Sequence, residues 1–323
     1  MTSKIKIALD CMGGDDAPTM VVRGADLAVE RQPDIFFHLV GNEEEIIPLI
    51  KASRHLDSDN HKITHTQKKV AADDKPSVAL RGGRDTSMRL AIDLVSDGSA
   101  HGVVSAGNTG ALMAMSKLSL RMCPGIERPA IASFFPTLKG ESCMLDLGAN
   151  IECDANNLVQ FAIMGEIFAR IVLGLKNPSV GLLNVGSEEQ KGHEELREAA
   201  TTLRELSNVI KFMGFIEGDD ITAGTVDVVV TDGFSGNVAL KAAEGTAIMF
   251  THFLRGAFQS TIFTKIGYFL CKSVIRQLRE RMDPRRYNGA VFLGLNGIAV
   301  KSHGGTDSEG FANAIGVAAD MAR

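Results

Sequence analysis

Val229-Val230-Thr231-Asp232-Gly233-Phe234-Ser235-Gly236-Asn237 is the stretch of this chain that decides its fold. It begins as a short apolar strand, stops at a glycine turn and opens directly into a sequence with helical spacing. In open α/β folds, ligands bind beyond the carboxyl ends of the parallel strands. We therefore expect Gly236 and Asn237 at a ligand site on the edge of such a sheet.

The same pattern, a short apolar run followed by a loop rich in Gly, Asn and Ser, occurs three more times. The loops follow residues 5–10, 102–104 and 180–183. We expect all four loops at one edge of a single sheet. Backbone N–H groups and helix N-termini at such an edge would suit an anion.

The two loops nearest the N-terminus also have a simpler interpretation. Gly13-Gly14 is consistent with an ordinary turn in which Asp15 and Asp16 cap the next helix. In Ser105-Ala106-Gly107-Asn108-Thr109-Gly110, capping explains the polar side chains but not the two glycines that flank Asn-Thr. This second loop therefore favours a phosphate or oxyanion site.

Lys191 and Asn237 have simpler interpretations as well. Lys191 follows Glu188 and Glu189 and is consistent with a solvated lysine in an acidic loop. Asn237 is consistent with the N-cap of a helix that begins at Val238. Taken alone, neither residue establishes a function.

Short apolar runs alternate with longer amphipathic runs along the whole chain. The predicted strands are 5–9, 35–40, 61–66, 102–104, 130–135, 142–145, 180–185, 226–230 and 290–293, and the predicted helices are 18–31, 43–51, 87–97, 155–173, 192–206, 238–251 and 307–322. Strands separated by helices indicate βαβ units. We predict an α/β fold with a doubly wound, mostly parallel, Rossmann-like sheet. It forms a single domain over 1–323, with 251–286 as a protruding helical hairpin.

The composition limits the class of protein. The chain has 323 residues, 45% of them hydrophobic, which is enough for one large α/β core. Its five cysteines are interpreted as reduced thiols. The sequence has no His/Cys cluster, so we predict no metal site. A formal net charge of −5 argues against nucleic acid as a partner. Without a secretory signal or an apolar run of about 20 residues, we expect a cytoplasmic protein with at most peripheral membrane contact.

Residues 251–286 interrupt the alternation of strands and helices. Leu254, Phe258, Ile262 and Ile266 recur at four-residue spacing, and basic side chains gather toward the end of the segment. An apolar face beside positive charge is typical of a helix that rests on anionic lipid. The same stripe also suits a hairpin packed in the core or in a dimer. These alternatives stay open.

Five further motifs accompany the four junctions. They are Lys75-Pro76-Ser77-Val78-Ala79-Leu80-Arg81, Arg128-Pro129-Ala130, Leu145-Asp146-Leu147-Gly148-Ala149-Asn150, Glu188-Glu189-Gln190-Lys191-Gly192 and Lys301-Ser302-His303-Gly304-Gly305. In this order, from about Ile5 to about Ile315, they resemble the bacterial phosphate acyltransferase family of phospholipid synthesis. The chain departs from the family at Cys11, where a small residue is common, and at Gly305-Thr306, where a serine pair is common.

The resemblance implies a reaction and a set of partners. Inorganic phosphate would react with fatty acyl-acyl carrier protein to give acyl phosphate, which feeds glycerol-3-phosphate acylation, and free carrier protein. The implied build is similar to that of phosphotransacetylases and isopropylmalate dehydrogenases. We expect no cofactor, a homodimer, and peripheral contact with membrane lipid and a downstream acyltransferase.

The resemblance also assigns roles to residues. Lys191 and Asn237 would be catalytic and would stabilise the oxyanion that forms on the thioester carbonyl. The predicted phosphate- or substrate-binding residues are Asp10, Gly13, Gly14, Arg81, Ser105, Gly107, Asn108, Thr109, Asn184, Gly236 and His303. Leu254, Phe258, Ile262 and Ile266 are the predicted membrane or partner residues.

Two alternatives remain. A phosphotransacetylase or a decarboxylating dehydrogenase would have a similar α/β build, although the chain has no nucleotide-binding fingerprint. From a different class, a catalytically silent scaffold docked on the membrane would recruit acyltransferases through the 251–286 segment. Detection of acyl phosphate formed by the purified protein would separate an enzyme from a scaffold.

Overall fold

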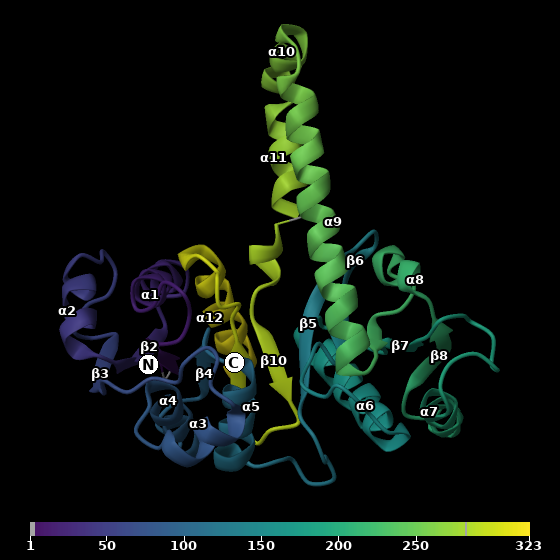
Figure 1. Cartoon of the computed structure of the whole chain (residues 1–323), viewed down its shortest axis with the longest axis horizontal. Coiled ribbons are helices and arrows are strands. Elements are labelled where there is room, and N and C mark those ends of the chain that lie inside the picture. The colour runs from purple at the N-terminus through teal and green to yellow at the C-terminus, as the bar shows by residue number, and fades with distance from the viewer. Residues whose placement is uncertain (1–3, 282) are drawn as a thin grey trace.

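The computed structural model describes residues 4–281 and 283–323, in which eleven strands form one sheet (Figure 1). Their order is β3-β2-β1-β4-β11-β10-β5-β6-β9-β7-β8. The strands are β1 (Ile5–Asp10), β2 (Ile35–Gly41), β3 (His61–His65), β4 (Gly102–Ser105), β5 (Ala130–Thr137), β6 (Gly140–Leu145), β7 (Ser179–Leu183), β8 (Lys211–Ile216), β9 (Val228–Val230), β10 (Ala290–Leu293) and β11 (Ile298–Lys301). Most neighbouring strands are parallel, which confirms the predicted fold class.

Twelve α-helices and one 3-10 helix are present in the described residues. They are α1 (Thr19–Arg31), α2 (Glu43–Lys51), α3 (Pro76–Gly82), α4 (Ser87–Ser96), α5 (Thr109–Leu120), α6 (Ala155–Val172), α7 (Glu194–Glu205), α8 (Gly218–Ala223), α9 (Gly233–Gln259), α10 (Ile262–Leu270), α11 (Lys272–Arg281), η1 (Pro284–Tyr287) and α12 (Ser308–Ala322). No helix in the described ranges is long and apolar enough to span a bilayer.

Both faces of the sheet are covered, as a doubly wound sheet requires. Ile5, Ile7 and Leu9 of β1 pack with α1 and α12, whereas Ala8 of the same strand packs with α4 and α5. Side chains alternate between the two faces of a strand, so one strand contributes to both apolar layers. Helices lie on both sides of the N-terminal half in Figure 1.

The direction of the strands reverses in the middle of the sheet. β10 is antiparallel to both β11 and β5, and β5 is antiparallel to β6. The strands β6, β9 and β7 therefore run opposite to β1, β4 and β11. The prediction that all four glycine-rich loops share one edge is wrong, because two loops follow strands of each direction. Pattern alone misses this reversal, since an apolar run carries no sign of its direction.

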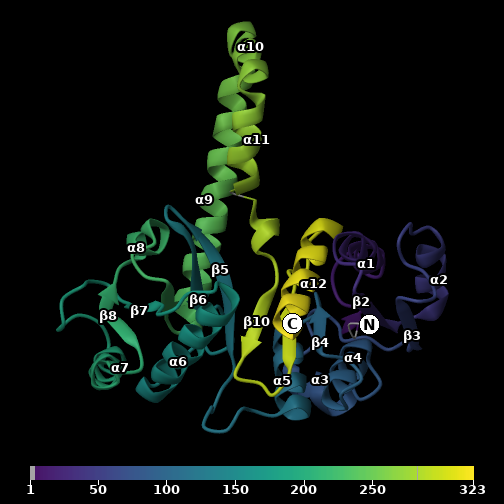
Figure 2. The same ribbon diagram turned by 180° about the vertical axis from the view of Figure 1, so that it is seen from behind.

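The segment after β9 forms a helical hairpin that protrudes from the rest of the molecule (Figures 1 and 2). α9 is a continuous helix, and the chain turns at its end into α10 and returns as α11. Because α9 ends at Gln259, the predicted stripe does not lie on one helix. Leu254 and Phe258 belong to α9, whereas Ile262 and Ile266 belong to α10.

Candidate functional site

Three adjacent strands end with polar side chains. β1 ends at Asp10, β4 at Ser105 and β11 at Lys301. The register pairs Leu9 with Val104 and Ser105 with Lys301, so the three residues are neighbours at one edge. Lys301 was not among the residues predicted from sequence. Lys301 opens the Lys301-Ser302-His303-Gly304-Gly305 motif, but its strand was missed and only His303 of that motif is a predicted site residue.

Asp10 is a buried anchor beneath this edge. Its carboxylate accepts hydrogen bonds at 2.6 Å from the hydroxyls of both Ser87 and Ser105. The Ser105 hydroxyl in turn accepts a hydrogen bond from the backbone N–H of Gly107 at 3.0 Å. Burial raises the pKa of Asp10, while these hydroxyls, the N–H of Met12 and the charge of Lys301 oppose the shift. The geometry favours a role in positioning the loops over direct contact with phosphate.

Gly13 and Gly14 let three loops approach one another closely. A Cβ atom at Gly13 would lie 2.5 Å from Asp10 Oδ2 and 2.7 Å from the backbone nitrogen of Gly107. Asp15, which follows Gly14, donates its backbone N–H to the carbonyl of Gly304. The loops after β1, β4 and β11 therefore meet backbone to backbone, and only glycine fits at the crossing.

Lys301 bends over this edge. Its ammonium donates hydrogen bonds to the carbonyl oxygens of Ala106, at 3.3 Å, and Ser302. Burial lowers the pKa of Lys301 to about 8, although Asp10 and Asp15 oppose the shift, and Lys241 of α9 lowers it further.

His303 lies beside Lys301 and is exposed. Its Nδ1 accepts a hydrogen bond from the N–H of Gly305, and its own N–H donates to Asn288. With Nδ1 acting as an acceptor, a neutral ring carries its proton on Nε2. The Nε2–H of His303 is therefore able to donate a hydrogen bond at the surface of the loop.

A second group of predicted site residues lies around Asp146, directly after β6. Its buried carboxylate accepts hydrogen bonds from the backbone N–H groups of Ile131, Gly148, Ala149 and Asn150, and from the Asn150 amide. Burial raises the pKa of Asp146, and these donors oppose the shift. A Cβ at Gly236 would lie 1.9 Å from the carbonyl oxygen of Asp146. The first turn of α9 is therefore packed directly on the 146–150 loop.

Asn237 is exposed on α9, beside Gly148. A Cβ at Gly148 would lie 3.7 Å from the Cβ of Asn237. The N-cap of α9 is Asp232, whose side chain accepts the N–H of Ser235 at 2.8 Å. The alternative interpretation, that Asn237 is the N-cap of a helix beginning at Val238, is wrong, because α9 begins at Gly233. The side chain of Asn237 is therefore exposed on the surface of α9, and the helix cap does not require its amide.

Lys191 is exposed on the loop that follows β7. The loop is held from below by Asn184, whose amide donates to the carbonyl of Lys191 at 3.1 Å and whose oxygen accepts the N–H of Val185. Both the amide nitrogen and the oxygen of Asn184 therefore bond to the backbone of this loop. β7 and β9 are adjacent and parallel, so Lys191 and Asn237 follow neighbouring strand ends.

Asn108 takes the simpler of its two interpretations. It caps α5 by accepting the N–H of Ala111 at 2.9 Å, and its amide donates to the carbonyls of Ala72 and Asp74. Thr109 is the first residue of α5 and is partly exposed at the helix N-terminus. Arg81 is exposed in the last turn of α3. Phosphate binding by these three side chains stays a prediction.

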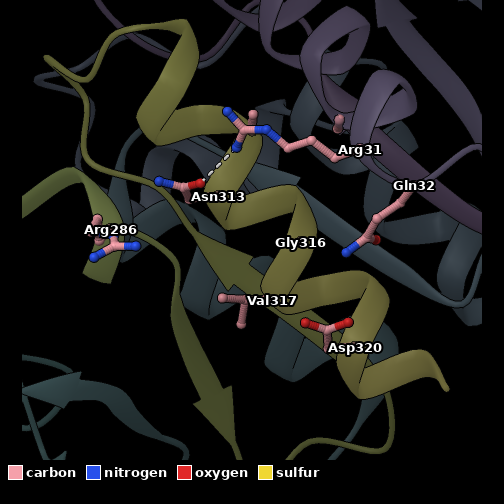
Figure 3. Close-up of a pocket in the computed structure, with 9 residues that line it drawn as sticks. Arg31, Gln32, Arg286, Asn313, Gly316, Val317 and Asp320 are labelled. Carbon is pink, nitrogen blue, oxygen red and sulfur yellow. Dashed lines mark hydrogen bonds between the residues drawn. The ribbon is translucent and has the colours of Figure 1, made fainter. Parts of the chain in front are cut away.

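A separate pocket of about 240 Å³ lies between α1 and α12 (Figure 3). It is lined by Ala28, Arg31, Gln32, Arg286, Ala312, Asn313, Gly316, Val317 and Asp320. Arg31 is already hydrogen-bonded to Asn313 at 3.0 Å and forms an ion pair with Glu309. None of the predicted site residues lines this pocket, so we do not assign it to the site.

Comparison with known proteins gives one family over nearly the whole chain. The family model described as "Fatty acid synthesis protein" matches residues 5–323. A phosphate acyltransferase of Rhodospirillum centenum is 63% identical over 321 residues, which cover 99% of this chain and 90% of the relative. A phosphate acyltransferase of Rhodospirillum rubrum is 57% identical over 323 residues, covering 100% and 92%.

Solved structures with the same fold are more distant in sequence. A phosphotransacetylase from Streptococcus pyogenes superposes with a TM-score of 0.66 at 17% identity, covering 100% of this chain and 95% of the other. The EutD phosphotransacetylase from Staphylococcus aureus gives 0.63 at 16% identity, covering 99% and 94%. At this level of identity the likeness concerns the fold alone.

Proposed function

From the premise that this chain belongs to the fatty acid synthesis protein family, with its phosphate acyltransferases, we propose that it acylates inorganic phosphate from fatty acyl-acyl carrier protein. The family is enzymatic, and the chain is a transferase of fatty acid and phospholipid synthesis. The product would be acyl phosphate, which serves glycerol-3-phosphate acylation. The carrier protein would leave with a free thiol.

The proposed chemistry is nucleophilic acyl transfer. A phosphate oxygen attacks the thioester carbonyl carbon, an oxyanion forms, and the C–S bond breaks to release a thiolate that takes up a proton. Phosphate is already partly dianionic near neutral pH, since its second pKa lies at about 6–7 by analogy with phosphorylated side chains. A strong general base is therefore not required. Catalysis would rest on positioning and on donors to the oxyanion.

One observation carries this assignment to residues. Lys191 and Asn237 are exposed on segments that follow adjacent strands, Lys191 on a loop held by the buried Asn184 and Asn237 on a helix capped by the half-buried Asp232. Preorganised donors of this kind stabilise a developing charge without having to reorganise first. Because β1 and β4 point the opposite way to β7 and β9, their loops form two distinct groups, and the proposed site requires the two groups to meet at the substrate.

Incubating the purified protein with acyl-acyl carrier protein and phosphate tests this function. Mass spectrometry should detect acyl phosphate and unacylated carrier protein in equal amounts. Acyl phosphate formed from acyl-coenzyme A but not from acyl-acyl carrier protein would favour a phosphotransacetylase. No acyl phosphate from either donor would favour a scaffold.

We also propose that the hairpin tip makes the peripheral membrane contact. Its exposed apolar side chains are Ile262, Phe263, Ile266, Phe269 and Leu270. Lys265 and Lys272 are exposed beside them and would interact with anionic headgroups. Phe258 instead packs edge-on against Tyr268 within the hairpin, with the two ring centroids 5.6 Å apart. A homodimer formed through the same hairpin is the competing proposal.

A further inference from the structure

Lys301 carries a charge that the described structure does not neutralise by direct contact. Its ammonium is largely buried, and it forms no ion pair with a carboxylate of residues 4–281 or 283–323. Its hydrogen-bond partners are two neutral carbonyl oxygens, on Ala106 and Ser302. An ammonium has three N–H donors, so one is left for another acceptor.

An unpaired buried ammonium is costly, because it has lost water without gaining an opposite charge. Burial accordingly lowers the pKa of Lys301 to about 8. An anion bound at the third N–H would supply the missing partner and favour the charged form. Lys301 is only partly buried as a residue, and a ligand at its third N–H would have to be small.

The charged groups that face Lys301 come from three elements. Asp10, at the end of β1, is turned toward the hydroxyls of Ser87 and Ser105. Asp15 lies over the loop after β11, where a Cβ at Gly305 would be 3.2 Å from its Oδ2. Lys241 of α9 lowers the pKa of Lys301 slightly, and its own charge is paired with Glu244 at 2.7 Å.

We propose that Lys301 is the ammonium that binds the inorganic phosphate substrate, at the point where the two loop groups meet. The proposal rests on the proposed function for the identity of the anion. Asp10 then acts as a positioning residue: through Ser105 it orders the 105–107 loop, whose Ala106 carbonyl holds the ammonium. The competing role for Lys301 is purely structural, as a cross-link between β11 and that loop.

The test is isothermal titration of the whole protein with inorganic phosphate, together with kinetics in which phosphate is varied. Lys301→Gln keeps a donor for the Ala106 carbonyl but loses the charge. We expect phosphate affinity to fall roughly 10- to 100-fold, as for loss of a charged hydrogen bond, with KM for acyl-acyl carrier protein unchanged. Lys117→Gln is the matched control, because Lys117 also donates to a backbone carbonyl but lies on α5, near Glu127.

The pH dependence gives a readout that a structural role would not change. Phosphate binding to the unaltered protein should weaken as the pH rises through about 8, because Lys301 loses its charge there. Lys301→Arg should still bind phosphate and should lose this step, since an arginine stays charged. This variant also keeps the test decisive if Lys301→Gln does not fold.

The outcomes separate this proposal from the function. Unchanged phosphate affinity in Lys301→Gln, with acyl phosphate still formed, would overturn the role of Lys301 and leave the function standing. Failure of Lys301→Arg to bind phosphate while it remains folded would also overturn it. Phosphate binding that depends on Lys301, without any acyl phosphate, would support the anion site and contradict the function.

Discussion

At the residue scale, the polar groups of the proposed site are of two kinds: buried side chains that hydrogen-bond to loops, and exposed side chains that are proposed to act on the substrate. Asp10, Asp146 and Asn184 use their oxygen atoms to hold loops. Lys191 and Asn237, in contrast, are exposed. The family motifs include both kinds of residue, so the sequence pattern does not distinguish them. Hydrogen-bond partners do.

Lys191→Ala and Asn237→Ala should each lower turnover by roughly 10²- to 10³-fold, the effect of removing one oxyanion donor. Both side chains are exposed, so melting temperatures should stay close to that of the unaltered protein. Lys176→Ala is a suitable control, because Lys176 is an exposed lysine of the same half on a different loop. Turnover near normal in a folded variant would remove that residue from the mechanism.

Gly236→Ala should destabilise the protein by at least about 1–3 kcal/mol, the usual effect of overpacking. The new methyl group would lie 1.9 Å from the carbonyl oxygen of Asp146, and backbone atoms have little room to move. Gly245→Ala in the same helix is the control, because nothing lies within 4 Å of its Cβ. Alanine there should stabilise α9 by up to about 1 kcal/mol. Equal midpoints of urea unfolding for the two variants would contradict this account.

At the scale of elements, the hairpin is the part whose role the fold explains least. The α9–α11 hairpin protrudes, and its tip exposes large apolar side chains that cost free energy in water. The turn at Ser260 divides the stripe expected from the sequence. As a result, Phe258 points to Tyr268 within the hairpin, and Phe263 and Phe269 are the better probes of the surface.

Changing Phe263 and Phe269 together to Asp should release the protein from anionic vesicles and spare activity on soluble acyl-acyl carrier protein. The two rings are 81% and 74% exposed, so the hairpin itself should survive the change. Leu138→Asp is the control, because Leu138 is 83% exposed but belongs to the turn between β5 and β6. Vesicle flotation and light scattering decide between partners. Loss of a dimer in place of lipid binding would contradict the membrane proposal.

At the scale of the whole molecule, the sequence predicts the elements better than their assembly. Nine strands were expected from apolar runs, and all nine are present. β8 and β11 were missed: β8 begins with Lys211 and is interrupted by Gly214, and β11 has only four residues. The reversal of direction at β10 depends on long-range pairing, which no local pattern reports. The sequence therefore identifies the loops of the site but not how they face one another.

This reversal leads to a prediction for the molecule as a whole. If phosphate binds where the two loop groups meet, it should protect loops of both halves from hydrogen exchange at once. Protection is expected in residues 10–16, 105–110 and 301–305 of one half and in 233–237 of the other. The physical reason is linkage: a ligand held by both halves stabilises both against opening, by about 2.7 kcal/mol at 100 times its Kd.

The pocket of Arg31 and Asn313 supplies an internal control for that measurement, because it lies between α1 and α12, and the site loops do not line it (Figure 3). Its helices should exchange at the same rate with and without phosphate. Protection limited to the loops after β1, β4 and β11 would mean that phosphate binds to one half only. In that case α9 would not take part in phosphate binding, and Lys191 and Asn237 would have to meet the thioester without help from the bound phosphate. Protection in both halves that disappears in Lys301→Gln would instead place the anion between them.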